Sequence, residues 1–138
     1  MYFEWKDSYG VNVEEIDRQH RKLFELGGRI SDLVLAKDGY DHYDEIMTIL
    51  EELKSYTIYH FGYEEKLMEE YGFQGLDTHK IEHMFLIKKL DRMKSKDIDA
   101  NQDDALINLI TFISDWISGH ILKTDMGYKE FFKEKGVN

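Results

Sequence analysis

The sequence predicts an all-α fold, an antiparallel up-down-up-down four-helix bundle with a short N-terminal arm. Apolar residues recur at spacings of three and four in four long segments, which is the pattern of amphipathic helices. The connections between these segments are short, as expected where consecutive helices lie antiparallel. No segment shows the period-two alternation of a half-buried strand. The 138 residues include no proline, so nothing in the sequence forces a break within a helix.

The first two helices are expected over residues 13–36 and 43–70. The buried stripe of the first includes a histidine and consists of Ile16, His20, Leu23, Phe24, Ile30, Leu33 and Val34. The stripe of the second includes a histidine and a glutamate and consists of Ile46, Ile49, Leu50, Leu53, Thr57, His60, Glu64, Leu67 and Met68. Residues 37–39 are expected to end the first helix, and residues 71–75 the second. Gly27 and Gly28 conflict with the first helix, since each costs about 1 kcal/mol relative to alanine. A close helix–helix approach is one explanation for them.

The third helix is expected over residues 76–94 and the fourth from residue 104 toward 132, separated by a polar loop at 95–103. The third stripe holds two histidines and consists of Leu76, His79, His83, Leu86, Ile87 and Leu90. The fourth consists of Leu106, Leu109, Ile110, Ile113, Ile117, His120 and Ile121. Every expected helix therefore carries at least one histidine among its core residues.

The composition excludes several classes of protein. The chain has no cysteine, which rules out thiolate catalysis, iron–sulfur clusters and cysteine-based zinc sites. Its net charge of −10 disfavours binding to nucleic acid or to an anionic membrane, because both need clustered lysine and arginine. The N-terminal residues lack the apolar run of a signal peptide, and no stretch reaches the roughly 18 apolar residues of a membrane span. We therefore expect a cytoplasmic protein.

Five of the six histidines fall on the buried stripes: His20, His60, His79, His83 and His120. One histidine on an apolar face is usually a hydrogen-bonded core residue. Five of them cannot easily satisfy one another in an apolar core, because each buried imidazole needs polar partners. A metal centre solves this problem, whereas a purely structural bundle with incidental histidines is the alternative.

The spacing of the polar residues narrows the possible ligands. His79 and His83 are four residues apart, so both rings project from one helix face, and His60 and Glu64 have the same spacing. Glu64 lies on an otherwise largely apolar face, whereas Glu65 is expected to be solvated. Near His120 the candidates are Asp115, Thr124 and Asp125. Asp125 lies about 140° further round an ideal helix, so spacing alone does not select it.

The ligand types indicate the metal. Five imidazoles with about two carboxylates and no thiolate suit iron, manganese, zinc or copper, and disfavour calcium and magnesium. Seven protein ligands are too many for one ion, but two ions sharing carboxylates would use them all. The Glu-x-x-His pattern of ferritin-like di-iron bundles is absent, because no histidine has a glutamate three residues before it. The His-Glu-x-x-His pattern of metalloproteases does not occur either.

The residues resemble the hemerythrin family of oxygen carriers over nearly the whole chain. The matching pieces are Trp5, Gly10-Val11, Ile16-Asp17-Arg18-Gln19-His20, His60-Phe61-Gly62-Tyr63-Glu64-Glu65, His79-Lys80-Ile81-Glu82-His83, Trp116-Ile117-Ser118-Gly119-His120, Asp125 and Tyr128. The resemblance implies a single hemerythrin-like domain over residues 1–138, with two non-haem iron ions. His79, His83 and His120 would hold one ion, and His20 and His60 the other. Glu64 and Asp125 would bridge the two ions together with an oxo or hydroxo group, which selects Asp125 over Asp115.

The function implied by this resemblance is reversible dioxygen binding, for oxygen storage, delivery or sensing, rather than enzymatic catalysis. Phe61, Trp116, Ile117 and Ile121 lie beside ligands and would form an apolar wall around the bound oxygen. The alternative is a di-iron enzyme that acts on nitric oxide or peroxide, or that repairs iron–sulfur clusters. The expected partner is dioxygen, with an oxygen-using enzyme or a signalling protein as a further candidate, and the expected oligomeric state is a monomer.

Overall fold

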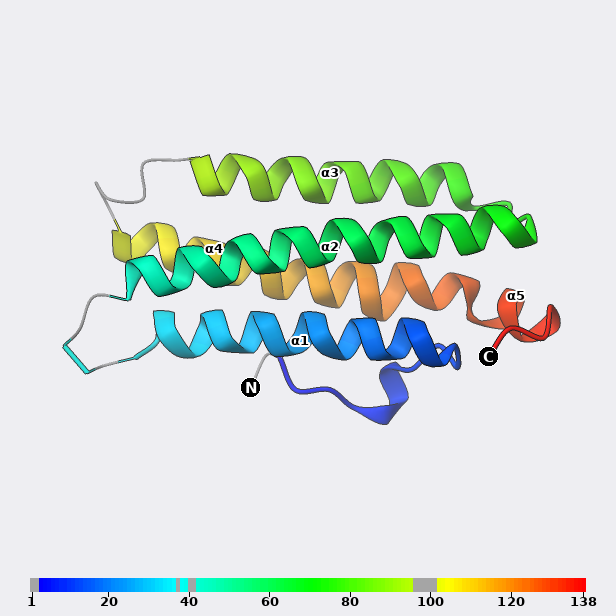
Figure 1. Cartoon of the computed structure of the whole chain (residues 1–138), viewed down its shortest axis with the longest axis horizontal. Helices are drawn as coiled ribbons and strands as arrows, with labels where there is room; N and C mark the ends of the chain where they lie inside the picture. The colour runs from blue at the N-terminus through cyan, green and yellow to red at the C-terminus, as the bar shows by residue number, and fades with distance from the viewer. Residues whose placement is uncertain (1–2, 37, 40–41, 96–101) are drawn as a thin grey trace.

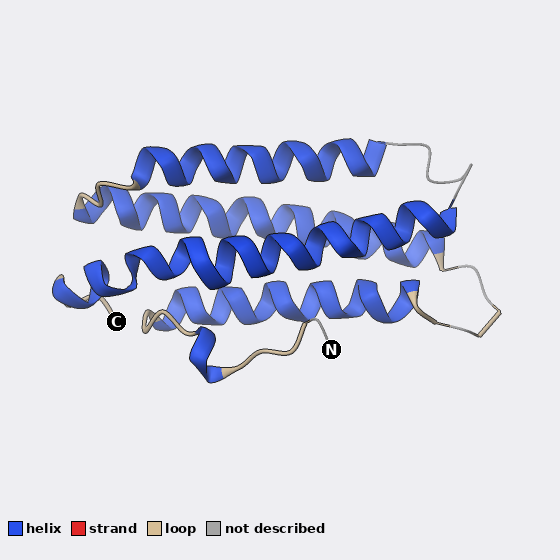
Figure 2. Ribbon diagram, turned by 180° about the vertical axis from the view of Figure 1, so that it is seen from behind, coloured by secondary structure: helices blue, strands red, loops and turns tan. Residues whose placement is uncertain are grey.

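The computed structural model describes residues 3–36, 38–39, 42–95 and 102–138, and these are mainly helical and contain no strand (Figures 1 and 2). The four long helices are α1 (Glu14–Val34), α2 (Tyr43–Tyr71), α3 (Leu76–Ser95) and α4 (Gln102–Trp116). They lie side by side along the long axis (Figure 1), and α1 packs against both α2 and α4 while α3 packs against α2 and α4. The predicted all-α four-helix bundle is confirmed.

The expected bounds of the first three helices are correct to within two residues at each end. Most of the expected loop at 95–103 lies outside the described residues. The fourth helix differs from the prediction, because it is not one continuous α-helix as far as residue 132. After α4 the chain forms the π-helix η3 (Ile117–Thr124), then the 3-10 helix η4 (Asp125–Tyr128) and the short helix α5 (Lys129–Glu134).

The core consists of two apolar clusters separated by a layer of buried polar side chains. The larger cluster fills most of the bundle, and the smaller one contains Val11, Val13, Ile16, Met68, Tyr128 and Phe132. Along α1, His20 lies between Ile16 of the smaller cluster and Leu23 of the larger one. Along α2, Glu64 lies between Phe61 and Met68, which again belong to different clusters. The polar layer thus crosses the bundle interior.

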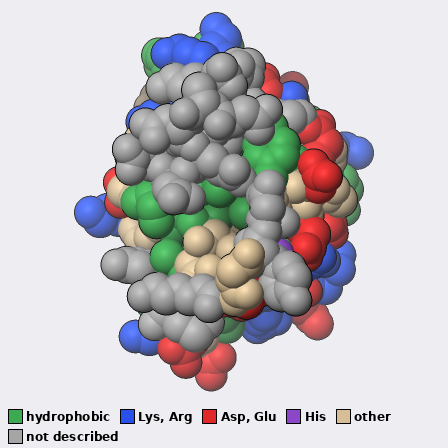
Figure 3. Space-filling model, turned by 90° about the vertical axis from the view of Figure 1, so that its left-hand side faces the viewer, with side chains coloured by type: hydrophobic (Ala, Val, Ile, Leu, Met, Phe, Trp, Pro, Cys, Tyr) green, Lys and Arg blue, Asp and Glu red, His purple; other side chains and the backbone are tan. Residues whose placement is uncertain are grey.

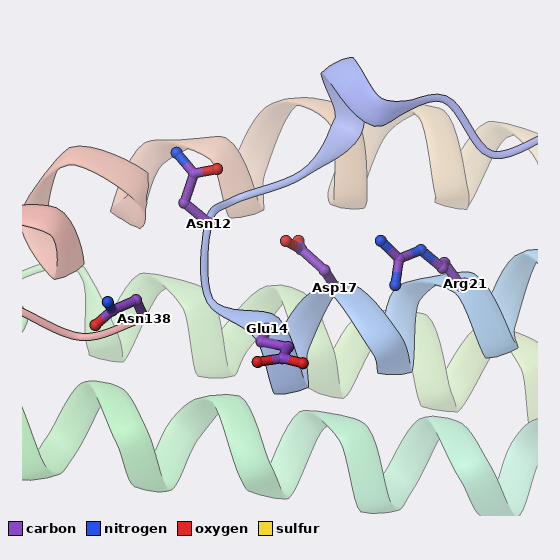
Figure 4. A pocket seen from close by; sticks show the side chains of 5 residues that line it. All are labelled: Asn12, Glu14, Asp17, Arg21 and Asn138. Atoms are coloured by element: carbon purple, nitrogen blue, oxygen red, sulfur yellow. The ribbon is translucent and has the colours of Figure 1, made fainter.

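The N-terminal arm runs beside α1 and includes the 3-10 helix η1 (Asp7–Tyr9) (Figure 1). Trp5 packs edge-on against Phe24 of α1, with ring centroids 5.4 Å apart. The backbone N–H of Val11 donates a hydrogen bond of 2.8 Å to Asp17, which joins the end of the arm to the first turn of α1. Asp17 also lines a polar surface pocket, together with Asn12, Glu14, Arg21 and Asn138 (Figure 4). The volume of this pocket is about 340 Å³.

Gly27 is explained by the arm, and the expected close approach of two helices is not the contact found there. A Cβ atom at Gly27 would lie 2.7 Å from ring carbons of Phe3, whereas at Gly28 the nearest atom would be the Phe3 Cβ at 3.6 Å. Phe3 is buried in the larger cluster, so it rests on the bare backbone of Gly27. Only Gly27 is therefore required by packing.

We expect Gly28→Ala to stabilise the protein and Gly27→Ala to fail to do so. Alanine at position 28 meets only an ordinary contact and should gain up to about 1 kcal/mol of helix propensity. At position 27 the same gain is offset, because the Phe3 ring must leave its place. Chemical denaturation of both variants measures the difference, and limited proteolysis should cut the arm of the Gly27 variant faster. Equal stabilisation by the two substitutions would contradict the explanation.

None of the described helices is both long enough and apolar enough to span a bilayer. Figure 3 views the bundle along its axis, from the end that lies on the left in Figure 1. Charged side chains of both signs are spread around the rim, and hydrophobic side chains are visible nearer the axis.

Candidate metal centre

All seven residues predicted as metal ligands lie in the polar layer inside the bundle. His20 comes from α1, His60 and Glu64 from α2, His79 and His83 from α3, His120 from η3 and Asp125 from η4. None of them is more than 3% exposed. Such a concentration of buried titratable groups is costly unless the groups are paired or coordinated.

These residues form two groups that share two members. In the first group Glu64, His79, His83, His120 and Asp125 each offer one ligand atom, and these atoms lie within 4.8 Å of one another. In the second group the same holds for His20, His60, Glu64 and Asp125. Because Glu64 and Asp125 belong to both, the layer has the form of two adjoining cation sites with two carboxylates between them.

Individual distances show how closely the ligand atoms converge. Asp125 lies between two histidines, with Oδ2 at 3.0 Å from His20 Nε2 and Oδ1 at 2.8 Å from His79 Nε2. His60 Nε2 lies 2.5 Å from Glu64 Oε1. Asp125 therefore contacts one histidine of each group through a separate oxygen, as a bridging group would. Glu64 contacts His60 through Oε1, while its Oε2 lies 3.7 Å from His79 Nε2.

The π-helix η3 explains how Asp125 reaches the site. In an α-helix a residue five positions after His120 would point well away from it, but hydrogen bonds from i to i+5 widen the turn. The N–H of Asp125 bonds to the carbonyl oxygen of His120, and Asp125 Oδ1 lies 3.1 Å from His120 Nε2. Asp115, the other acidic candidate, is exposed on α4. π-turns inside helices are frequent at functional sites.

Three histidines make a hydrogen bond through Nδ1, on the side of the ring away from the centre of the layer, to residues that the sequence pattern did not identify. His83 Nδ1 is 2.9 Å from Glu65 Oε2, His120 Nδ1 is 2.9 Å from Glu82 Oε1, and His60 Nδ1 is 2.7 Å from Gln19 Oε1. The expectation that Glu65 is solvated was wrong, because it is half-buried against His83. Their position next to a predicted ligand in the sequence could have identified them, since this is shared by Gln19, Glu65 and Glu82.

Tyr128 supports one of the shared carboxylates. It is fully buried, its hydroxyl donates a 2.7 Å hydrogen bond to Glu64 Oε2, and its ring lies against that of His79. Burial, together with the charges of Asp125 and Glu64, raises the pKa of Tyr128 well above its usual range. Tyr128 therefore stays protonated and acts as a hydrogen-bond donor to Glu64.

The donor atoms fit a cation. A carboxylate can only accept, so Glu65 and Glu82 require N–H groups at Nδ1 of His83 and His120, and the Nε2 atoms then carry lone pairs in the neutral rings. These two Nε2 atoms lie 3.0 Å apart in a buried site, so a positive species has to lie between them or on one of them. Four further ligand atoms make no hydrogen bond of acceptable geometry despite their close neighbours: His20 Nε2, His60 Nε2, Glu64 Oε1 and Asp125 Oδ2. Imidazole and carboxylate donors without thiolate suit iron among other first-row metals.

The pKa values of the metal-free protein lead to the same view. Burial and the nearby charges of His120 and His79 lower the pKa of His83 to about 2, so the His83 ring is neutral. Burial opposes the charged form of His120, but the charge of Asp125 and a hydrogen bond to it raise the pKa of His120 to about 9. Burial also opposes ionisation of Asp125, yet the charge of His120 and the close ring nitrogens of His120, His20 and His79 hold its pKa well below the usual range. Without a metal ion, a proton on His120 supplies part of the positive charge that the carboxylates attract, and a metal ion has to displace it.

The four residues predicted to line the oxygen pocket are all buried in the larger apolar cluster: Phe61, Trp116, Ile117 and Ile121. The ring of Phe61 stacks on His83, with centroids 3.7 Å apart, and meets His120 edge-on at 5.4 Å. Trp116 lies edge-on to Phe61. The contacts of Phe61 are thus mainly with two histidines of the first group. A surface groove of about 520 Å³ between α2 and α3 reaches Phe61 and His83.

Comparison with known proteins agrees with this geometry. Residues 11–132 match the family model of the hemerythrin HHE cation binding domain. The chain is 40% identical to a bacteriohemerythrin of Clostridium acetobutylicum over 126 residues, covering 91% of this chain and 98% of the relative. It is 33% identical to a bacteriohemerythrin of Pseudomonas aeruginosa, covering 90% and 77%, and 29% identical to a myohemerythrin of Riftia pachyptila, covering 92% and 91%. The family match covers the histidine- and carboxylate-lined layer, and we conclude that this chain belongs to the hemerythrin family.

Proposed function

We propose that the chain binds dioxygen reversibly at a pair of non-haem iron ions, and that it is an oxygen-binding protein rather than an enzyme. The observation that carries the proposal is the pair of buried ligand groups with Glu64 and Asp125 in common. Membership of the hemerythrin family supports the choice of iron and of dioxygen among the metals and ligands that such donors could accept.

In this proposal the first group holds one ion through His79, His83 and His120, and the second group holds the other through His20 and His60. Glu64 and Asp125, which belong to both groups, would be the ligands that the two ions share. The second group has one histidine fewer than the first, which would leave room there for a small exogenous molecule. A pair of ferrous ions held by the two groups would supply the two electrons that reversible binding of dioxygen uses.

The residues of the chain keep this chemistry reversible. Tyr128 holds Glu64 in place through its hydroxyl, and it stays protonated because its pKa is raised. Phe61, Trp116, Ile117 and Ile121 are buried and cover their side of the layer with apolar groups, which would limit the supply of protons to the site. A protein that provides neither extra protons nor reductant releases dioxygen instead of consuming it.

The family match over residues 11–132 supports a single di-iron domain. Storage, delivery and sensing of oxygen all use the same reversible binding step. A cytoplasmic location, a monomeric state and a protein partner that uses or senses oxygen stay predictions.

The decisive experiment combines an iron count with a visible spectrum. The purified protein is reduced without air, exposed to air, and then returned to an oxygen-free atmosphere. We expect two iron ions per chain and an absorption band that appears in air and disappears on deoxygenation. Absence of the band, or a band that deoxygenation does not remove, would contradict oxygen carriage. Sustained turnover of nitric oxide or peroxide, well above the rate of spontaneous oxidation, would favour the enzyme alternative instead.

A further inference from the structure

Gln19 connects the surface of α1 to a buried histidine of the metal centre. Its side chain is fully buried, and its Oε1 lies 2.7 Å from His60 Nδ1. Its Nε2 donates a hydrogen bond of 3.0 Å to Glu15 Oε1. Glu15 in turn pairs with the exposed Arg18 through both carboxylate oxygens. Gln19 is thus the middle member of a hydrogen-bond network that runs from solvent to His60.

This hydrogen-bond network determines which nitrogen of His60 carries a proton. A glutamine side chain has a donor end and an acceptor end, whereas a carboxylate can only accept. Glu15 therefore holds the donor end of Gln19, and the acceptor end has to face His60. His60 Nδ1 must then be the donor, which leaves the lone pair of the neutral ring on Nε2, the atom that points to Glu64. The orientation of the amide follows from the network and not from the amide itself.

The partner of His60 also differs in charge from the partners of His83 and His120. His83 and His120, in the first group, donate to the carboxylates of Glu65 and Glu82. His60, in the second group, donates to a neutral amide. An anionic acceptor makes an imidazole a more basic ligand and favours the higher oxidation state of the metal, and a neutral acceptor does so less. The two halves of the centre are therefore tuned in different directions.

We propose that Gln19, oriented by Glu15, is a positioning residue that keeps the iron ion of His20 and His60 more easily reduced than a carboxylate at the same place would. This inference rests on the proposed function, because it concerns the ion at which an exogenous molecule has room. A higher reduction potential there slows loss of the ferrous state. In that loss, two ferrous ions give two electrons to one dioxygen, which takes two protons from solvent and leaves as hydrogen peroxide.

The test exchanges the two side chains in the double variant Glu15→Gln, Gln19→Glu. The hydrogen bond between positions 15 and 19 can be kept, since the new amide donates to the new carboxylate, and the net charge of the chain is unchanged. We expect the same iron content as in the wild type, a lower midpoint potential in a potentiometric titration, and oxidation in air that is about tenfold faster, at the lower end of outer-partner effects on metal sites. The matched control is Gln74→Glu, which makes the same replacement as Gln19→Glu at an exposed position. It should alter neither the midpoint potential nor the rate of oxidation in air.

A second variant keeps the inference testable if the exchanged protein does not fold. Glu82→Gln replaces a carboxylate partner by an amide beside His120, so the midpoint potential should move upward. The inference is overturned if the double variant shifts the midpoint potential no more than Gln74→Glu does. If the double variant does not fold, the same criterion applies to Glu82→Gln. If the wild type itself shows no band that appears in air and disappears on deoxygenation, the proposed function fails, and the potentials are not needed to establish that.

Discussion

Glu64→Ala is expected to empty the metal centre. Glu64 belongs to both candidate ligand groups, so in the proposed centre its removal would take a ligand from each ion, and it would leave Tyr128 without its acceptor. An ion present at about a thousand times its dissociation constant stabilises a protein by about 4 kcal/mol, and this contribution should be lost. We expect an iron count near zero and a melting temperature that no longer changes when a chelator is added.

The control for Glu64→Ala is Glu69→Ala, which removes an exposed carboxylate from the same helix. Its iron content should equal that of the wild type, and its free energy of unfolding should differ by no more than about 0.5 kcal/mol. Two ions bound normally by the Glu64 variant would show that this carboxylate does not bridge them. The proposed sharing of ligands between the two groups would then be wrong.

His79→Ala is expected to remove one ion and retain the other. His79 belongs only to the first group, and the four members of the second group remain in place. The iron content should fall to about half, and the stability with iron should fall as well, because metal binding contributes to the free energy of folding. Comparison with Glu64→Ala therefore tests the division into two groups, through iron counts and chemical denaturation with and without chelator.

His42→Ala is the matched control for His79→Ala. His42 is the one histidine that is not a predicted ligand. It lies just before α2, where its ring contacts Asp38 and Glu45. Its replacement should leave both ions bound. Loss of both ions from the His79 variant would mean that the second group cannot hold iron alone, and retention of both would remove His79 from the ligands.

The helices could be predicted from the sequence because each buries one stripe, and burial imposes a spacing of three and four residues. The same reasoning placed His20, His60, Glu64, His79, His83 and His120 in the core. It could not place Asp125, because a spacing of five is unfavourable in a regular helix and becomes favourable only in the π-helix η3. The resemblance to a known family selected Asp125 where the spacing left three candidates open.

The outer partners of the histidines could not be predicted in the same way. Gln19, Glu65 and Glu82 are polar residues at the edge of a buried stripe, where the pattern is equally compatible with solvent. Which of these residues points into the bundle depends on the side chains of the neighbouring helix. The sequence around the residue itself does not contain this information. The same is true of Gly27, whose reason is the ring of Phe3, more than twenty positions away in the sequence.

The widened turn of η3 and the metal centre depend on each other. Isolated π-turns gain little from their own backbone, so η3 persists through what its side chains contact. Asp125, whose N–H bonds to the carbonyl oxygen of His120 at the end of η3, lies close to histidines of both groups. Opening the turn would detach Asp125 from both halves at once, and detaching Asp125 would remove the reason for the turn. In terms of local stability, we therefore expect residues 117–125 and the candidate metal centre to form one cooperative unit that opens and closes as a whole.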